Sequence, residues 1–339
     1  MIGVDVTHQA PTLDEVAREA GVSRSTASRA INGGDRVSPA SQAAVEAAIA
    51  HLGFTPNRAA RALATSQTGS IALVIPEPDD LFVSDPFLLG VVRGVSGALA
   101  GTQTQLVLLI NHAGQPVGQM ARYLRAGHVD GAIITSPHRG DGLEDALRGS
   151  RSVVFIGRPF RSEGISYVDV DNVEGGRLAA QTLLDAGRRR LGTVTGPTDM
   201  TAAIDRLDGF TRALADAGLP ADAVDDGGFT AAGGEAAAHR LLDRHPDLDG
   251  LVVASDVMAV GVRHALEDRG LRVPEDVAIV GFDNLGAAAA MTPRLTTVHN
   301  PLVEMVDAAA RILIGRLDGG GTPGENLVLP PHLVPGSTV

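Results

Sequence analysis

The sequence predicts a small all-α domain followed by an α/β core of two doubly wound parallel-sheet subdomains. Helical periodicity with recognisable caps dominates residues 11–64. From residue 71 onward, short apolar runs rich in β-branched residues alternate with helical stretches. This alternation is typical of parallel sheets covered on both faces. A crossing near Tyr167–Asp171 separates the runs into two sets, so we expect two sheets.

The helical segment begins with a pattern that predicts a helix-turn-helix. Thr12 and Glu15 have the spacing of a capping box at the start of a first helix. Gly21 lies where the chain must turn, and Ser23 can cap a second helix. The outer face of that second helix carries hydrogen-bond donors that suit base edges and phosphates in a DNA major groove: Arg24, Ser25, Ser28 and Arg29. The alternative is an ordinary helical hairpin with a solvated face.

Two further helices are expected before the core. Ser38-Pro39 is a cap followed by a favoured first-turn proline, and it opens a third helix that runs to Leu52. Thr55-Pro56 opens a fourth helix of only about two turns, which is marginal in water on its own. We therefore expect this helix to fold on a partner. Its large apolar residue, Leu63, is expected to enter a minor groove as a wedge, with burial in a core as the alternative.

The chain resembles the LacI/GalR family of transcriptional regulators. The resemblance is carried by TLDEVAREAGVS…ASRAING, by VSPASQAAVEAAIAHLGFTPNRAARALA and by several downstream segments, and it extends from Thr12 onward. It implies a periplasmic-binding-protein-like core in which the chain crosses between subdomains three times. A ligand is then expected in the cleft outside the carboxyl ends of the strands. The predicted boundaries are a disordered lead at 1–10, a DNA-binding domain at 11–64 with a hinge helix at 56–64, a linker at 65–70, and an effector-binding and dimerisation core at 71–339.

The resemblance implies a sequence-specific repressor whose operator affinity is controlled by a small molecule, a sugar by family precedent. A homodimer would read a near-palindromic operator in double-stranded DNA, because its two recognition helices must lie one DNA turn apart. The residues expected to contact DNA are Ser23, Arg24, Ser25, Ser28, Arg29, Asn32, Asn57, Arg58, Ala60 and Leu63.

Three ligand-binding positions follow from the resemblance. Arg206 in TGPTDMTAAIDRLDGF matches the family's arginine, and its guanidinium suits hydroxyls or a carboxylate. Asp283 in VGFDN matches the family's ligand-binding acid, and Phe229 stands where the family places an aromatic platform. The alternatives are an Arg206 paired with Asp205 or Asp208 at the surface, and an Asp283 that only caps a loop.

Four more positions are assigned to the ligand on weaker grounds. Asp85 and Phe87 lie in the first strand–helix loop, and Arg158 follows the fourth strand. Ser255 precedes a helix, so capping is its alternative role, as it is for Asp85 and for Asp256. The pair Asp171-Asn172 also has the pattern of a cap, and we expect no ligand contact there.

Composition limits the other classes of function. The net charge of −12 argues against nucleic acid binding by the whole chain, yet residues 1–64 hold six arginines against six acidic residues. The chain has no cysteine, which excludes disulfides and thiolate metal sites. Nucleophile-elbow, Walker and HExxH motifs are absent, so we expect neither an enzyme, nor a cofactor, nor a metal.

Two other classes of protein could share the predicted core. A solute (sugar)-binding protein without a DNA role shares the predicted core, but the helix-turn-helix and the lack of a signal peptide argue against it. An enzyme on the same core would need a nucleophile or metal set. Because no apolar run reaches about eighteen residues, no membrane contact is expected, and we expect a cytoplasmic protein.

We predict that Arg29→Ala weakens binding to the specific operator by about 1–3 kcal/mol and relaxes the preference at one base pair, because Arg29 lies on the outward face of the second helix. Selection from randomised half-sites measures this. An unchanged preference at every position would remove Arg29 from the base-reading set.

Overall fold

The computed structural model describes residues 11–31, 37–55, 67–110, 118–321 and 324–339. Its contacts divide the chain into two compact units, residues 1–69 and 70–339, which are described separately. The predicted lead at 1–10, Asn32 and the predicted hinge helix with Asn57, Arg58, Ala60 and Leu63 lie outside the described residues.

The first unit contains the three predicted helices α1 (Leu13–Glu19), α2 (Arg24–Ile31) and α3 (Pro39–Leu52). The capping box is confirmed: Glu15 N–H donates to Thr12 Oγ1 at 3.3 Å, and Thr12 N–H donates to Glu15 Oε2 at 2.7 Å. Ser23 caps α2 by accepting from Thr26 N–H at 3.1 Å. Small side chains let the helices approach closely around a core of Val16, Ala17, Ala27, Ala30, Val45 and Ala48.

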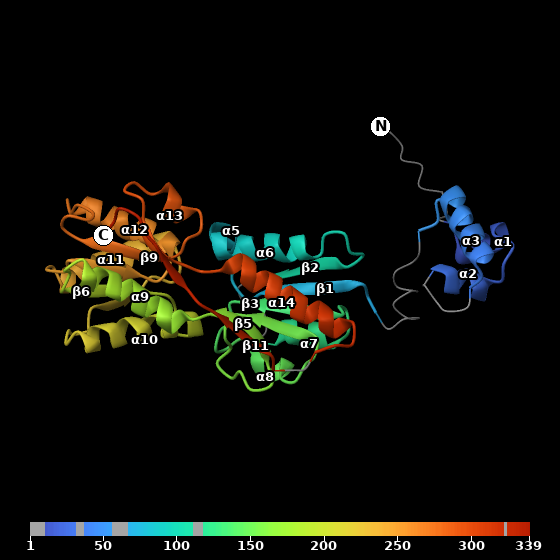
Figure 1. Cartoon of the computed structure of the whole chain (residues 1–339), viewed down its shortest axis with the longest axis horizontal. Coiled ribbons are helices and arrows are strands. Elements are labelled where there is room, and N and C mark those ends of the chain that lie inside the picture. The colour runs from blue at the N-terminus through green and yellow to red at the C-terminus, as the bar shows by residue number, and fades with distance from the viewer. Residues whose placement is uncertain (1–10, 32–36, 56–66, 111–117, 322–323) are drawn as a thin grey trace. The chain divides into compact units, whose positions relative to one another are not determined.

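The second unit is built on two sheets, as predicted, and each sheet has six strands (Figure 1). The first has the order β11-β5-β4-β3-β1-β2 and is parallel throughout. Its strands are β1 (Ser70–Ile75), β2 (Gln105–Ile110), β3 (Gly131–Thr135), β4 (Val153–Ile156), β5 (Ser166–Val170) and β11 (Asn326–Leu329).

The second sheet has the order β12-β10-β9-β8-β6-β7, and within it only β12 runs antiparallel to its neighbour. Its strands are β6 (Leu191–Thr195), β7 (Val224–Asp226), β8 (Gly250–Val253), β9 (Ala278–Asp283), β10 (Thr296–His299) and β12 (His332–Val334).

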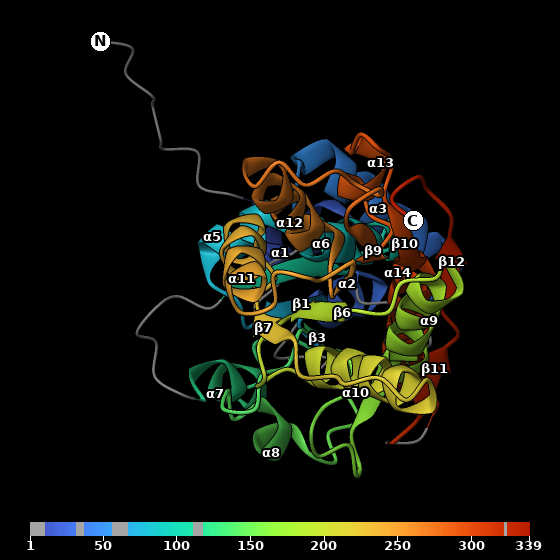
Figure 2. The ribbon, with the colours of Figure 1, turned by 90° about the vertical axis from the view of Figure 1, so that its left-hand side faces the viewer.

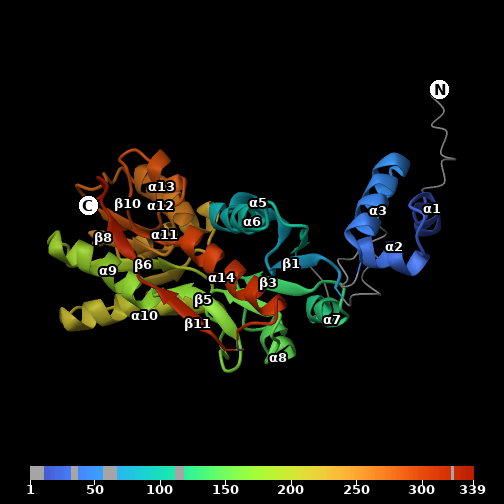
Figure 3. The same cartoon turned by 45° about the vertical axis from the view of Figure 1, so that its right-hand side comes forward.

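Helices cover both faces of the first sheet because alternate residues of its strands point to opposite sides. In β1, Ile71, Leu73 and Ile75 pack in the same cluster as α6 and α14, whereas Ala72 and Val74 pack in the cluster of α7 and α8. Figure 3 shows α6 and α14 side by side. The helices of this subdomain are α5 (Asp79–Ser84), α6 (Pro86–Ala98), α7 (Gln119–Arg125), α8 (Leu143–Leu147) and α14 (Leu302–Leu317).

The second sheet is covered in the same way, with α9 and α10 packed together and α11 and α12 packed together (Figure 2). The helices here are α9 (Asn172–Asp185), α10 (Thr201–Asp216), α11 (Ala231–Arg244), α12 (Asp256–Asp268) and α13 (Ala287–Ala290). The chain passes between the subdomains after β5, after β10 and between β11 and β12, which confirms the expected three crossings.

Glycines set the close approach of α9 to α10. A Cβ on Gly209 would lie 1.9 Å from the carbonyl oxygen of Val173, and one on Gly176 would lie 2.1 Å from that of Arg206. The backbones of the two helices therefore touch at these positions. This contact holds the start of α10, and with it Arg206, against α9.

We predict that Gly209→Ala destabilises the protein by at least about 1–3 kcal/mol, because the two backbones must separate to admit a methyl group. Gly97→Ala is the matched control, since a Cβ at that helical position meets nothing within 4 Å and should be neutral or slightly stabilising. Thermal unfolding compares the two. Equal melting temperatures for both variants would contradict the account of this helix crossing.

Candidate functional site

A central cavity lies between the two sheets of the core. It encloses about 740 Å³, counting the solvent at its mouth. Residues that end or follow strands form much of its wall, including Glu77 after β1, Ser136 after β3, Asn172 after β5, Ser255 after β8 and Asp283 at the end of β9. The cavity therefore sits at the carboxyl ends of the strands, where open parallel sheets bind ligands.

Arg206 is buried and held from several sides. Its Nε donates to Asn172 Oδ1 at 2.9 Å, and Nη1 donates to the carbonyl oxygen of Ala254. The guanidinium carbon lies 3.6 Å from the centre of the Phe282 ring, a stacking contact. Nη2 lies 3.7 Å from Asp283 Oδ1 and has no hydrogen bond to a described residue. The N–H groups of Nη2 remain for a ligand.

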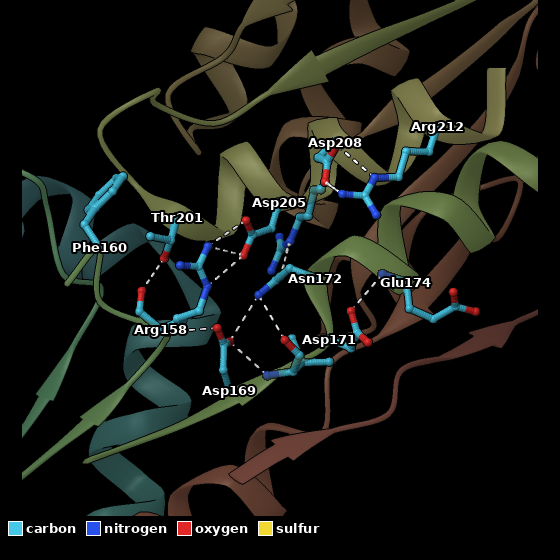
Figure 4. A network of polar contacts seen from close by, with 12 residues as sticks. Arg158, Phe160, Asp169, Asp171, Asn172, Glu174, Thr201, Asp205, Asp208 and Arg212 are labelled. Atoms are coloured by element: carbon cyan, nitrogen blue, oxygen red, sulfur yellow. Dashed lines mark hydrogen bonds and ion pairs between the residues drawn. The ribbon is translucent and has the colours of Figure 1, made fainter. Parts of the chain in front are cut away.

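The alternative of a surface pair for Arg206 is wrong. Asp205 binds Arg158, and Asp208 binds Arg212 at 2.6 Å on the outer side of α10, as Figure 4 shows. Arg206 turns to the opposite side of the helix and lines the cavity.

Asp283 faces Arg206 from the end of β9. Its Oδ1 accepts from Asn300 Nδ2 at 3.2 Å, and burial raises the pKa of this carboxyl while the charge of Arg206 opposes the rise. Its backbone has φ 109°, and two other lining residues, Ser136 (φ 50°) and Phe229 (φ 54°), also adopt positive φ. Such conformations cost free energy and are concentrated at functional sites.

The cavity wall is strongly acidic. Glu77, Asp85, Asp169 and Asp283 all line it, and Arg206 is the only basic side chain among the described lining residues. Burial raises the pKa of Asp85 to about 7 and that of Asp169 to about 6. The wall thus offers many hydrogen-bond acceptors and few fixed positive charges.

Phe229 supplies an aromatic face to this wall. A Cβ on residue 196 would lie 2.2 Å from the ring, so Gly196 makes room for it. The Phe229 ring centre lies 6.0 Å from the guanidinium carbon of Arg206. Phe87 also lines the cavity. The site therefore combines apolar faces with polar groups, as small-molecule sites do.

Capping and lining the cavity are not exclusive roles. Asp85 caps α6 by accepting from Phe87 N–H at 2.8 Å, and Ser255 caps α12 by accepting from Met258 N–H at 3.2 Å. Both also line the cavity. Asp171 caps α9 as expected, but Asn172, for which no ligand contact was expected, lies in the cavity wall.

The assignment of Arg158 to the ligand needs correction. Its Nη2 donates to both carboxylate oxygens of Asp205 at 2.7 Å, and its backbone N–H donates to Asp169 Oδ2 at 2.8 Å (Figure 4). The neighbouring Gly157 lines the cavity, whereas Arg158 does not. Arg158 joins the first subdomain to α10 of the second.

Six polar residues of the wall were not predicted from the sequence: Glu77, Ser136, Asp169, Asn172, Thr201 and Asn300. The rule that ligands bind at carboxyl ends of strands could have found Glu77 and Asp169. Asn300 follows β10 and was not assigned to the ligand from the sequence. Its Oδ1 is buried with no hydrogen-bond partner among the described residues, which marks an acceptor that a ligand could satisfy.

The outer face of α2 in the first unit forms a second candidate site. Arg24, Ser25 and Arg29 are exposed there, and Ser28 is half-buried. Arg24 Nε lies 3.5 Å from Asp14 Oδ1, and Arg29 Nε donates to the carbonyl oxygen of Ser25 at 3.2 Å. Exposed ion pairs of this kind are weak, so Arg24 can exchange its partner for a phosphate or a base.

Comparison with known proteins shows the family to which the chain belongs. A family model described as "Bacterial regulatory proteins, lacI family" matches residues 12–57, and one described as "Periplasmic binding protein-like domain" matches residues 180–339. The chain is 44% identical over 329 residues to the HTH-type transcriptional regulator CelR of Thermobifida fusca, covering 96% of this chain and 97% of the relative. The chain belongs to the LacI family.

Other family members support the assignment along the whole chain. The ribose operon repressor of Escherichia coli K12 is 35% identical over 330 residues, covering 95% of this chain and 98% of that protein. A CelR–cellobiose complex has a TM-score of 0.76 at 41% identity and covers 97% of this chain and 100% of its own. A lac repressor dimer bound to operator and the anti-inducer ONPF has a TM-score of 0.84 at 26% identity, with coverages of 97% and 99%.

As a LacI-family member, the protein is a DNA-binding transcriptional regulator controlled by a small molecule, and not an enzyme. The outer face of α2 lies within the region that matches the family's DNA-binding domain. In the part of the chain that the structure describes, no helix is long and apolar enough to cross a bilayer.

We predict that Arg206→Ala abolishes the response to effector while operator binding persists, because Arg206 lies in the core and the outer face of α2 lies in the other unit. Arg212→Ala is the control, since Arg212 is exposed on the same helix and pairs only with Asp208 among the described residues. Gel shifts with and without effector measure both. A response of Arg206→Ala at the wild-type effector concentration would show that this arginine does not bind the effector.

Proposed function

We propose that the protein is a cytoplasmic, homodimeric repressor that releases a near-palindromic operator when a sugar binds in the central cavity. The observation that carries this proposal is the pair Arg206 and Asp283, which face each other in the cavity with Nη2 of Arg206 and a carboxylate oxygen available. A donor and an acceptor at this spacing suit adjacent hydroxyls of a sugar ring. The ribose operon repressor and the CelR–cellobiose complex are relatives whose names include a sugar.

The charge of the cavity wall indicates which kind of sugar can bind. Four carboxylates and one guanidinium leave an excess of negative charge in a partly buried site. An anionic effector such as a sugar phosphate would add unpaired buried charge, which is costly. A neutral polyhydroxy compound instead donates hydroxyls to the carboxylates and places an apolar ring face on Phe229.

The dimer follows from the geometry of DNA reading. One α2 presents a single short face to the groove, and helix-turn-helix proteins gain specificity by placing two such faces one helical turn apart. The lac repressor resembles this chain over nearly all of its length, and its structure is that of a dimer on operator.

Cellobiose is the first probe, because it is present in the complex of CelR, which is 41% identical to this chain. Glucose 6-phosphate serves as the anionic control. We expect cellobiose to raise the melting temperature of the protein and to release operator in a gel shift, and the phosphate to do neither. Tight operator binding that no neutral mono- or disaccharide alters would contradict the proposal.

We predict that sugar affinity falls as the pH drops from about 8 to 5.5. Burial places the pKa of Asp85 at about 7 and that of Asp169 at about 6, so both carboxyls take up protons in this window. Sugar hydroxyls donate best to ionised carboxylates, so protonation should weaken binding by roughly tenfold per coupled pKa unit. Calorimetric titration across the range measures it. Asp85→Asn should remove the change in sugar affinity at the upper end of this pH range. A wild-type affinity that does not change with pH would argue against contacts between the sugar and these carboxylates.

A further inference from the structure

His138 occupies the rim of the cleft between two carboxylates from different subdomains. Its Nε2 lies 2.9 Å from Oε1 of Glu77, which follows β1 in the first subdomain. Its Nδ1 lies 3.0 Å from Oδ2 of Asp199, which precedes α10 in the second. Because each ring nitrogen faces an acceptor, both must carry a proton, so the ring is an imidazolium. Burial alone would lower the pKa of His138, but hydrogen bonds and charge from the two carboxylates raise it to about 9.

The backbone is joined at the same place. His138 forms an isolated antiparallel bridge with Met200, and Arg139 N–H donates to the carbonyl oxygen of Asp199 at 2.9 Å. Close by, Thr201 Oγ1 donates to the carbonyl oxygen of Arg158, and the Arg158 side chain binds Asp205 (Figure 4). One rim of the cleft is therefore closed by a row of contacts between subdomains.

This row also completes the cavity. Ser136 and Pro137 immediately precede His138, Met200 immediately follows Asp199, and all three line the wall. Glu77 lines the wall as well and is only 5% exposed. Among described residues, His138 is the only hydrogen-bond partner of the Glu77 carboxylate.

We propose that His138 is a charged tie that holds the two subdomains at the spacing in which the effector cavity is complete. Removing the imidazolium leaves the Glu77 carboxylate buried without a partner, which is strongly unfavourable. Separation of the subdomains at this rim relieves the cost, because it lets water reach Glu77. The cavity then loses the wall formed by residues 136–137 and 200, and the fraction of molecules able to bind effector falls. His138 acts as a positioning residue, and its role in effector binding rests on the proposed function.

The chain has no cysteine, so a pair of spin labels can be attached cleanly. Ala126→Cys at the end of α7 and Ala215→Cys on α10 place exposed labels in the two subdomains. Pulsed electron paramagnetic resonance then measures the distance between subdomains without any effector. We expect a longer and broader distribution in His138→Gln than in the wild type. His128→Gln is the control, since His128 is exposed in the same subdomain and should leave the distance unchanged.

A second variant and a pH series distinguish a charged interaction of His138 from a role of its ring in packing. Asp199→Asn, at a half-exposed side chain, should lengthen the distance between the subdomains, and combining it with His138→Gln should lengthen it little further.

The charged groups around the His138 ring are Glu77, Asp199, Asp141 and the adjacent Arg139. Asp141 Oδ2 accepts from His138 N–H at 3.1 Å. As pH rises through about 9, the imidazolium loses its proton and the wild-type distance should approach that of His138→Gln.

An unchanged distance in His138→Gln and Asp199→Asn, or a wild-type distance independent of pH between 7.5 and 10, overturns the tie. In the same proteins, cellobiose affinity should fall at least fivefold in His138→Gln and stay unchanged in His128→Gln. A wild-type protein that does not bind cellobiose, with the distance changes present, would count against the proposed effector and leave the tie standing.

Discussion

The buried guanidinium of Arg206 is the interaction on which the core site depends. Four neighbours fix it: the Phe282 ring below it, Asn172, the carbonyl oxygen of Ala254, and the charge of Asp283. These neighbours come from α9, from the end of β8 and from β9, so the arginine joins the elements that surround the cavity. Burial lowers the pKa of Arg206, and the nearby carboxylates oppose that effect and keep the cation in place. Among the described residues, Arg206 is the basic side chain that lines this acidic cavity.

The helix crossing explains why the arginine can be placed so precisely in the wall. Gly176 and Gly209 allow α9 and α10 to touch along their backbones, and the backbone of Arg206 is itself the point in α10 that faces Gly176. Larger residues there would push α10 outward and withdraw the guanidinium from Asn172 and Asp283. The Arg206–Gly209 spacing in the sequence is thus a packing requirement as much as a ligand signature.

Much of the fold could be predicted because its signals are local. Strands β3, β4 and β6 are short apolar runs of the predicted kind, and α3 was predicted from its cap and first-turn proline. Strand β7 has only three residues, β10 is half threonine, and β11 is mostly exposed, so none of them forms an apolar run. β7 and β11 are edge strands and β10 lies between β9 and β12, so these strands form because neighbouring strands pair with them, which no local pattern encodes.

The site was predictable where a residue's role follows from its motif. Arg206, Asp283 and Phe229 line the cavity as expected. Arg158 was misassigned because its partner, Asp205, lies 47 residues away and becomes adjacent only after the subdomains assemble. His138 was missed for the same reason, because Asp199 lies 61 residues away in the other subdomain. Pairings between subdomains decide their roles, and these pairings are also what a moving cleft would make and break.

The central claim is that sugar binding in the core cavity and operator binding by the outer face of α2 are thermodynamically coupled. Linkage requires the coupling to be reciprocal: if a sugar weakens operator affinity by some factor, operator must weaken sugar affinity by the same factor. The most direct test is to measure the dissociation constant of cellobiose with and without saturating operator DNA. The account predicts weaker cellobiose binding in the presence of operator, by the factor found in the reverse titration. Equal cellobiose affinity in both conditions would contradict it.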